Sequence, residues 1–282
     1  MEPKWVFGSI GPGTKLPTLG HTSYEKLRDA YEECARGLID GGADALLVET
    51  SQDLLQTKAA INGCRQALDK QSRNLLLIAQ VTVETTGTML LGSEIGAALT
   101  ALEPLNIDVI GLNCATGPAE MSEHLRQLSQ SSDVMLSCMP NAGLPILEGG
   151  GARYPLSPKE LAKSLETFIN DYGLKIVGGC CGTTPKHLAE VVRTLRKMTG
   201  EPKQPKAVSY DPGAASLYQH ASFRQQNTYM AIGERTNANG SKAFREALLS
   251  ENWQECLEIA KEQIRRSEEH TSELQSRFGI SY

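Results

Sequence analysis

Between residues 6 and 198 the sequence alternates short apolar segments with longer segments of helical period. The apolar segments cover residues 6–10, 45–49, 75–83, 109–115, 134–140 and 176–182. The longer segments have apolar residues at i, i+3, i+4 and i+7 and cover 24–40, 54–70, 93–105, 119–130, 158–172 and 185–198. This alternation is typical of βα units, so the sequence predicts a parallel sheet of six strands.

The predicted strands are almost continuously apolar, which indicates a sheet that is covered on both faces. An open doubly wound sheet and a closed (β/α)8 barrel both meet this condition. The six units fall two short of a closed barrel. We therefore expect an α/β fold over residues 1–198, either doubly wound or an incomplete TIM-type barrel.

A change of composition after residue 198 indicates a boundary between two domains. Residues 199–226 are rich in Pro, Gly and Lys without a period and are interpreted as a linker. Residues 227–265 predict one strand over 230–233 and one long amphipathic helix over 241–264. A single βα unit cannot bury its own apolar face, so this unit is interpreted as the truncated start of a second domain. Residues 266–276, RSEEHTSELQS, resemble a translated DNA-sequencing adapter, and 266–282 are interpreted as a non-native tail.

Charge and hydropathy favour small molecules as partners. The net charge is -5, and the 28 Lys and Arg residues form no basic stripe, which argues against nucleic acid. No apolar run reaches the ~18 residues of a membrane span, and the first residues lack the pattern of a signal peptide. We expect a cytoplasmic protein with no membrane partner.

Two cysteine motifs at strand ends indicate a metal site. The seven cysteines are odd in number and irregularly spaced, which fits reduced thiols better than a disulfide framework. Cys114 ends one predicted strand, and the adjacent Cys180 and Cys181 end another, with glycines beside each motif. Because the carboxyl ends of parallel strands meet at one rim, we expect these three thiols to converge on Zn2+, which favours sulfur ligands. The absence of a C-x2-C pair favours an open, catalytic type of site, suited to alkyl transfer to a substrate thiolate.

Two further polar residues end predicted strands at the same rim. The carboxylate of Glu49 is a candidate to bind a substrate ammonium group, although an acidic residue near a helix start is an equally good interpretation. The side-chain carbonyl of Asn141 is a candidate to fill an empty metal position. The remaining cysteines are interpreted as packing residues, namely Cys34, Cys64, Cys138 and Cys256.

The cysteine motifs resemble the homocysteine-binding barrel of the zinc-dependent homocysteine S-methyltransferases. The segments that carry the resemblance are GLNCATGP (111–118), MPNAGLP (139–145) and GGCCGTTPKHL (178–188). AIGERTNANGSKAFREAL (231–248) is similar to the first βα unit of the pterin-binding domain that follows this barrel in the cobalamin-dependent methionine synthases. The resemblance covers about residues 5–265 and implies a barrel that lacks its first two βα units, followed by the first unit of a second barrel.

The resemblance also implies an activity and site residues. Zn2+ on Cys114, Cys180 and Cys181 would bind the homocysteine thiolate, with Asn141 as a ligand when substrate is absent. Glu49 would meet the homocysteine amino group, and Glu234 and Asn237 would belong to a folate site. In the full-length enzyme the methyl group passes from methyltetrahydrofolate through methylcobalamin to homocysteine and gives methionine. We expect the present chain to be inactive in this transfer, because the DGAMGT-type opening strand and the cobalamin-binding region have no counterpart in it.

Two other functions agree with the same cysteines. One is a homocysteine S-methyltransferase that uses betaine or S-methylmethionine as methyl donor. The other is a thiol-redox or structural zinc-binding protein without a substrate.

Overall fold

The computed structural model describes residues 4–148, 151–198, 211–216, 218–224, 234–263 and 265. The chain divides into two compact units, Met1–Ser222 and Phe223–Tyr282, and each is described by itself. The strand expected over 230–233 and the tail 266–282 lie outside the described residues. Within the described residues, no helix is both long enough and apolar enough to cross a membrane.

The first unit is built on a six-stranded parallel sheet whose strand order follows the chain, β1-β2-β3-β4-β5-β8. The strands are β1 (Phe7–Ile10), β2 (Ala45–Ser51), β3 (Leu76–Val81), β4 (Val109–Asn113), β5 (Met135–Met139) and β8 (Ile176–Val177). Each lies within an apolar segment predicted to be a strand, except that β2 extends two residues further. The last strand is much shorter than predicted, because the chain turns into a glycine-rich loop after Val177.

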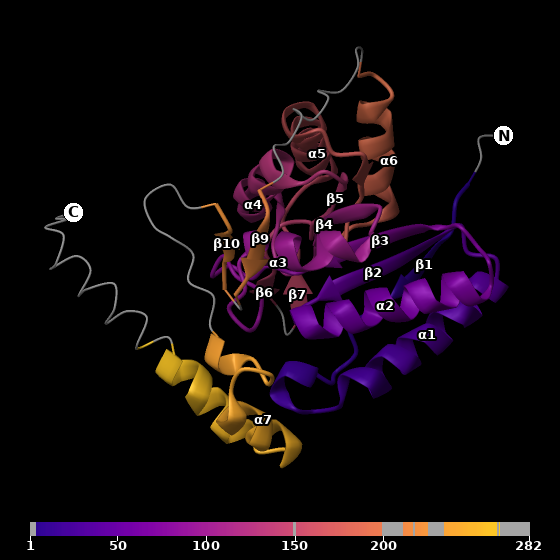
Figure 1. Ribbon diagram of the computed structural model, residues 1–282. Helices are drawn as coiled ribbons and strands as arrows, with labels where there is room; N and C mark the ends of the chain where they lie inside the picture. Colours follow the sequence, from indigo (N-terminus) through magenta and orange to yellow (C-terminus); the bar gives the residue numbers. More distant parts are fainter. Residues whose placement is uncertain are drawn as a thin grey trace, which may run out of the picture. The chain divides into compact units, whose positions relative to one another are not determined.

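A helix follows each strand of the sheet, and the last, α6, follows β8. The helices are α1 (Tyr24–Asp40), α2 (Leu54–Lys70), α3 (Ile95–Leu102), α4 (Pro118–Ser131), α5 (Pro158–Tyr172) and α6 (Pro185–Leu195), with short 3-10 turns η1 (Pro17–Leu19) and η2 (Glu103–Leu105). Consecutive helices contact one another from α1 to α6, as Figure 1 shows for α1 and α2 below β1 and β2. The helices therefore form one continuous layer along the sheet.

Two apolar clusters lie on opposite faces of this sheet. The larger contains Leu46, Val48 and Ile110 together with residues of the helices. The smaller contains only strand residues at its centre, with Leu47, Ile78 and Val109 buried there. Because side chains alternate along a strand, the two sets point to opposite faces, and the helices cover only one of them. This arrangement excludes a doubly wound sheet and agrees with a curled parallel sheet from part of a TIM-type barrel.

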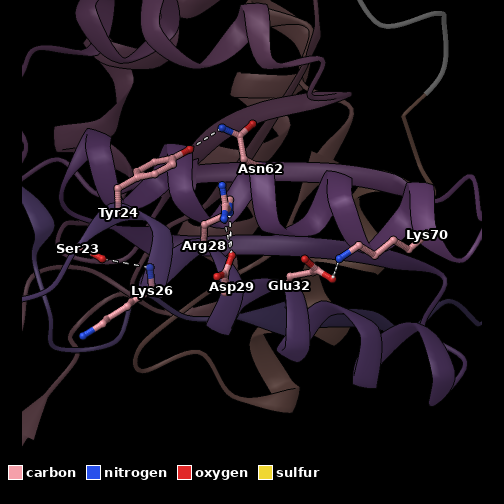
Figure 2. Close-up of polar contacts among 8 residues, drawn as sticks. All are labelled: Ser23, Tyr24, Lys26, Arg28, Asp29, Glu32, Asn62 and Lys70. Atoms are coloured by element: carbon pink, nitrogen blue, oxygen red, sulfur yellow. Dashed lines mark hydrogen bonds and ion pairs between the residues drawn. The ribbon is translucent and has the colours of Figure 1, made fainter.

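The contact between α1 and α2 is close and polar at its edges (Figure 2). A Cβ atom at Gly63 would lie 2.6 Å from the Arg28 carbonyl oxygen, so only glycine permits this helix crossing. Asn62 Nδ2 donates to the Tyr24 hydroxyl at 2.6 Å, and Lys70 forms an ion pair with Glu32. These contacts fix the two helices against each other.

Two short antiparallel hairpins were not predicted. One is β6 (Ile146–Glu148) with β7 (Gly151–Arg153), in the segment between β5 and α5. The other is β9 (Gly213–Ala215) with β10 (His220–Ser222), inside the segment interpreted as linker. This second hairpin contacts α3, where Thr100 Oγ1 lies 2.7 Å from His220 Nδ1. Residues 213–216 and 218–222 therefore belong to the first unit and are not a structureless linker.

In the second unit, the prediction of one long helix over 241–264 is wrong. The unit contains the 3-10 turn η3 (Glu234–Thr236), then α7 (Lys242–Leu249), and a separate helical stretch over 253–263. Glu251 interrupts the helix with a left-handed φ of 55°. Asn252 then accepts a hydrogen bond from the Glu255 amide at 3.2 Å and caps the next helix.

Candidate metal and substrate site

The three predicted cysteines lie together at the carboxyl end of the sheet. Cys114 follows β4, and Cys180 and Cys181 follow β8. Cys114 Sγ is 3.7 Å from Cys181 Sγ, and Cys180 Sγ is 4.0 Å from Cys181 Sγ. All three sulfur atoms lie within 4.8 Å of one another. The structure thus brings Cys114 to the adjacent Cys180 and Cys181, which lie 66 residues or more further along the chain.

The loop after β4 reaches this position through an unusual backbone. Cys114 and Ala115 both have left-handed conformations, with φ of 60° and 56°. Such conformations cost on the order of 1–3 kcal/mol for residues other than glycine and are concentrated at functional sites. The Thr116 amide donates to the Cys114 carbonyl at 2.7 Å and closes the turn.

Asn141, in the loop after β5, connects the two cysteine loops. Its Oδ1 accepts a hydrogen bond from the Cys181 amide at 3.0 Å, and its own amide donates to the Thr116 carbonyl at 3.0 Å. The side chain is 3% exposed and also hydrogen-bonds Cys114. The structure therefore places Asn141 beside Cys114 and Cys181, while its role as a metal ligand stays a prediction.

Tyr154, which sequence analysis did not single out, covers the loop that contains Cys181. Gly182 has a left-handed φ of 78°, and a Cβ atom there would lie 2.2 Å from Cγ of Tyr154. Burial makes the largest contribution in raising the Tyr154 pKa, and the nearby Cys181 thiol adds to it. The signal in the sequence was only that this tyrosine precedes the proline that leads into α5.

The thiols differ in protonation. The neighbouring Cys180 thiol makes the largest contribution in lowering the pKa of Cys114 to about 6. Burial opposes this shift, and the Ala115 amide, Cys181 and Asn141 add to it. The neighbouring Cys114 in turn makes the largest contribution in raising the pKa of Cys180, and burial adds to it. Cys114 is therefore a thiolate at neutral pH and is ready to bind a metal cation.

The geometry of the sulfur atoms fits a tetrahedral metal. Two thiolates at about 2.3 Å from a tetrahedral Zn2+ lie about 3.8 Å apart. The observed separations of 3.7 and 4.0 Å agree with this value. Among the residues that the structure describes, this is the only cluster of three or more His, Cys, Asp or Glu side chains that meets the spacing for a metal ion. Three sulfur donors leave one tetrahedral position for another ligand.

Glu49 lies at the same rim, in a network that sequence analysis did not foresee. Ser9 Oγ donates to Glu49 Oε1, and Asn113 Nδ2 donates to Glu49 Oε2 at 3.3 Å. Asn113 is fully buried, and its Nδ2 lies 4.0 Å from Cys180 Sγ. The residue immediately before Cys114 therefore connects the carboxylate with the thiols. Glu49 as an ammonium ligand stays a prediction.

Of the four cysteines outside the cluster, two are packing residues. Cys64 and Cys138 are fully buried, as predicted, and Cys138 Sγ contacts Met121 Sδ at 3.7 Å. Cys256 is half-buried. The prediction for Cys34 is wrong, because this residue is exposed on the outer side of α1.

Glu234 and Asn237 belong to the second unit. Glu234 begins η3, and the Asn237 carbonyl oxygen accepts the amides of Gly240 and Ser241 at 3.0 and 2.8 Å. Asn237 thus shapes the turn before α7, and folate binding by either residue stays a prediction.

The fold and the thiol cluster define a family. Residues 1–195 match the homocysteine S-methyltransferase family, and the chain belongs to it. The chain is similar to the methionine synthase of Mycobacterium tuberculosis, with 61% identity over 262 residues, which are 93% of this chain and 22% of that protein. Similarity to the methionine synthase of Mycobacterium leprae is 59% over 264 residues, again 93% of this chain and 22% of the relative. The chain therefore spans about a fifth of the length of these curated relatives.

Solved structures show the same fold. The homocysteine methyltransferase MmuM of Escherichia coli in its apo form superposes with a TM-score of 0.52 at 22% identity, over 67% of this chain and 62% of that one. Its metallated form gives a TM-score of 0.50 at 22% identity, over 68% and 61%.

Proposed function

We propose that this chain is the homocysteine-activating part of a methionine synthase. Cys114, Cys180 and Cys181 would hold Zn2+, and the homocysteine sulfur would take the open fourth position. The observation that carries this proposal is the convergence of three thiols within 4.8 Å of one another, with two of the separations, 3.7 and 4.0 Å, close to the value for a tetrahedral metal. When bound, Zn2+ supplies Lewis acidity that keeps the substrate sulfur deprotonated at neutral pH.

The chain's own residues orient the substrate in this proposal. Glu49, held by Ser9 and Asn113, would accept the homocysteine ammonium group. Asn141 connects the two cysteine loops, and Tyr154 packs against the loop that contains Cys181. Three thiolates with Zn2+ give a net charge of -1, which keeps the bound substrate sulfur electron-rich and nucleophilic.

The whole reaction belongs to the longer protein that the relatives represent. We propose that methyltetrahydrofolate methylates cobalamin there and that methylcobalamin methylates homocysteine, which gives methionine. Glu234 and Asn237 would contribute to the folate site. Identity of 61% to a methionine synthase supports this donor over betaine or S-methylmethionine.

A spectroscopic titration tests the proposal on the chain as it stands. The chain loaded with Co2+ is expected to gain sulfur-to-cobalt charge-transfer absorption when homocysteine is added, and to show no gain with homoserine, in which a hydroxyl replaces the thiol. The variant Cys34→Ser serves as a control and should respond to homocysteine as the unaltered chain does, because Cys34 is exposed on α1 and lies outside the cluster. A spectrum that does not respond to homocysteine, or responds equally to homoserine, would refute the substrate.

A further inference from the structure

We propose that Asn113 is a positioning residue that couples the amino-group subsite at Glu49 to the thiol cluster at Cys180. This inference rests on the proposed function and deepens it. Asn113 ends β4 and is 0% exposed, so its amide group must satisfy its hydrogen bonds within the protein. All the polar contacts of this side chain lie at the substrate rim.

The first set of contacts fixes the end of β2. Asn113 Oδ1 accepts a hydrogen bond from the Thr50 amide at 2.7 Å, and Nδ2 donates to Thr50 Oγ1 at 2.8 Å. Thr50 has a left-handed φ of 58°, and the pairing of β2 with β3 shifts register between Val48 and Ser51. The amide of Asn113 thus holds the irregular stretch of β2 that contains both Glu49 and Thr50.

The second set of contacts joins two acidic groups. The nitrogen that donates to Thr50 also lies 3.3 Å from Glu49 Oε2 and 4.0 Å from Cys180 Sγ. A primary amide has two N–H groups, so the hydrogen not used by Thr50 faces the carboxylate and the sulfur together. A neutral donor here contacts both groups without cancelling the negative charge of Glu49 that would attract an ammonium group.

This arrangement matches the substrate class. An α-amino acid with a terminal thiol carries its ammonium and its sulfur on one short chain, and the two groups must reach Glu49 and the metal together. Because Asn113 contacts both receiving groups, it sets their separation. We infer that Asn113 selects thiols that also carry an amino group.

The test compares two thiols on the zinc-loaded chain. 4-Mercaptobutyrate has the same carbon chain as homocysteine and lacks the amino group, so the ratio of the two dissociation constants reports the amino-group subsite. Asn113→Asp keeps the shape and the acceptor for Thr50 but removes the donor to Glu49. The preference for homocysteine is expected to fall at least about tenfold, with zinc affinity reduced about tenfold through the lost contact to Cys180.

Three comparisons make the result decisive. Asn62→Asp, the same change in the α1–α2 contact, should leave both the ratio and zinc affinity unchanged. If Asn113→Asp does not fold, Asn113→Ser takes its place, because it introduces no buried charge. This variant should show a smaller loss of the preference for homocysteine. In a Glu49→Gln background, Asn113→Asp should cost no further preference, because Asn113 acts through Glu49.

The outcomes separate this inference from the proposed function. If the unaltered chain binds homocysteine and Asn113→Asp binds it with the same preference, the inference is wrong and the proposed function stands. If the unaltered zinc-loaded chain binds neither thiol, the proposed function fails and the inference with it.

Discussion

Cys114 and Cys138 lie at the ends of neighbouring strands, yet they have opposite properties. Cys138 is fully buried within β5, and burial raises its pKa. Cys114, one residue beyond β4, is half-buried among hydrogen-bond partners that lower its pKa to about 6. A thiol inside the sheet is therefore a small apolar side chain, whereas a thiol just past the strand end is a ligand or nucleophile.

The largest difference is expected in reactivity towards an alkylating reagent. In the metal-free chain, Cys114 should react with iodoacetamide at a rate that falls as the pH decreases through about 6, because the thiolate is the nucleophile. Cys64, whose pKa burial raises to about 12, and Cys138 should react on the order of a thousandfold more slowly in the folded chain. Mass spectrometry of the peptides gives the rates. A Cys114 rate that still rises from pH 8 to pH 9 would contradict the low pKa.

Loss of one rim thiol should be the next largest effect. Cys114→Ser is expected to weaken zinc binding by about a hundredfold or more, because one of three sulfur ligands is removed. Competition with a chromophoric chelator measures this affinity. Cys34→Ser, on the exposed side of α1, is expected to bind zinc as the unaltered chain does. Equal affinities of the two variants would show that the cluster does not hold the metal.

The core thiol should show the reverse pattern. Cys138→Ser places a hydroxyl beside Met121 in the apolar core and is expected to lower the free energy of unfolding by about 1–3 kcal/mol. Its zinc affinity should stay within twofold of the unaltered chain. Urea unfolding and the chelator competition are measured on the same sample. A stable variant with weakened zinc binding would place Cys138 in the site and break the comparison.

The smallest effect is expected far from both thiols, in the helix layer (Figure 2). Lys70→Ala removes the ion pair between Lys70 and Glu32, in which the Lys70 side chain is 61% exposed. We expect a loss of stability of about 0–1 kcal/mol, smaller still at high salt, and no change in zinc affinity. A loss above about 2 kcal/mol would show that the helix pair depends on this charge.

Sequence periodicity predicted the elements that local patterns determine. The bounds of α1, α2 and α5 agree with the predicted segments, because each has a regular apolar stripe and a clear start such as Ser23 or Ser157. The three cysteines were predicted as one cluster because parallel strands end at one rim. The break at Glu251 was missed, since a left-handed residue leaves no mark in a helical period.

The network around Asn113 could not be predicted, because it depends on contacts between strands. Its partner Thr50 is 63 residues away, and the register shift between Val48 and Ser51, which includes Glu49, exists only in the assembled sheet. In the sequence, Asn113 looks like the last polar residue of a strand. The hairpins β6–β7 and β9–β10 were missed for a similar reason, since strands of three residues are too short to show an alternation.

X-ray absorption at the zinc edge tests most directly whether the two loops share one metal. For the chain loaded with one equivalent of Zn2+, the account predicts three sulfur atoms at about 2.3 Å and one lighter ligand, becoming four sulfur atoms when homocysteine is added. A first shell of nitrogen and oxygen with at most one sulfur, unchanged by homocysteine, would contradict it.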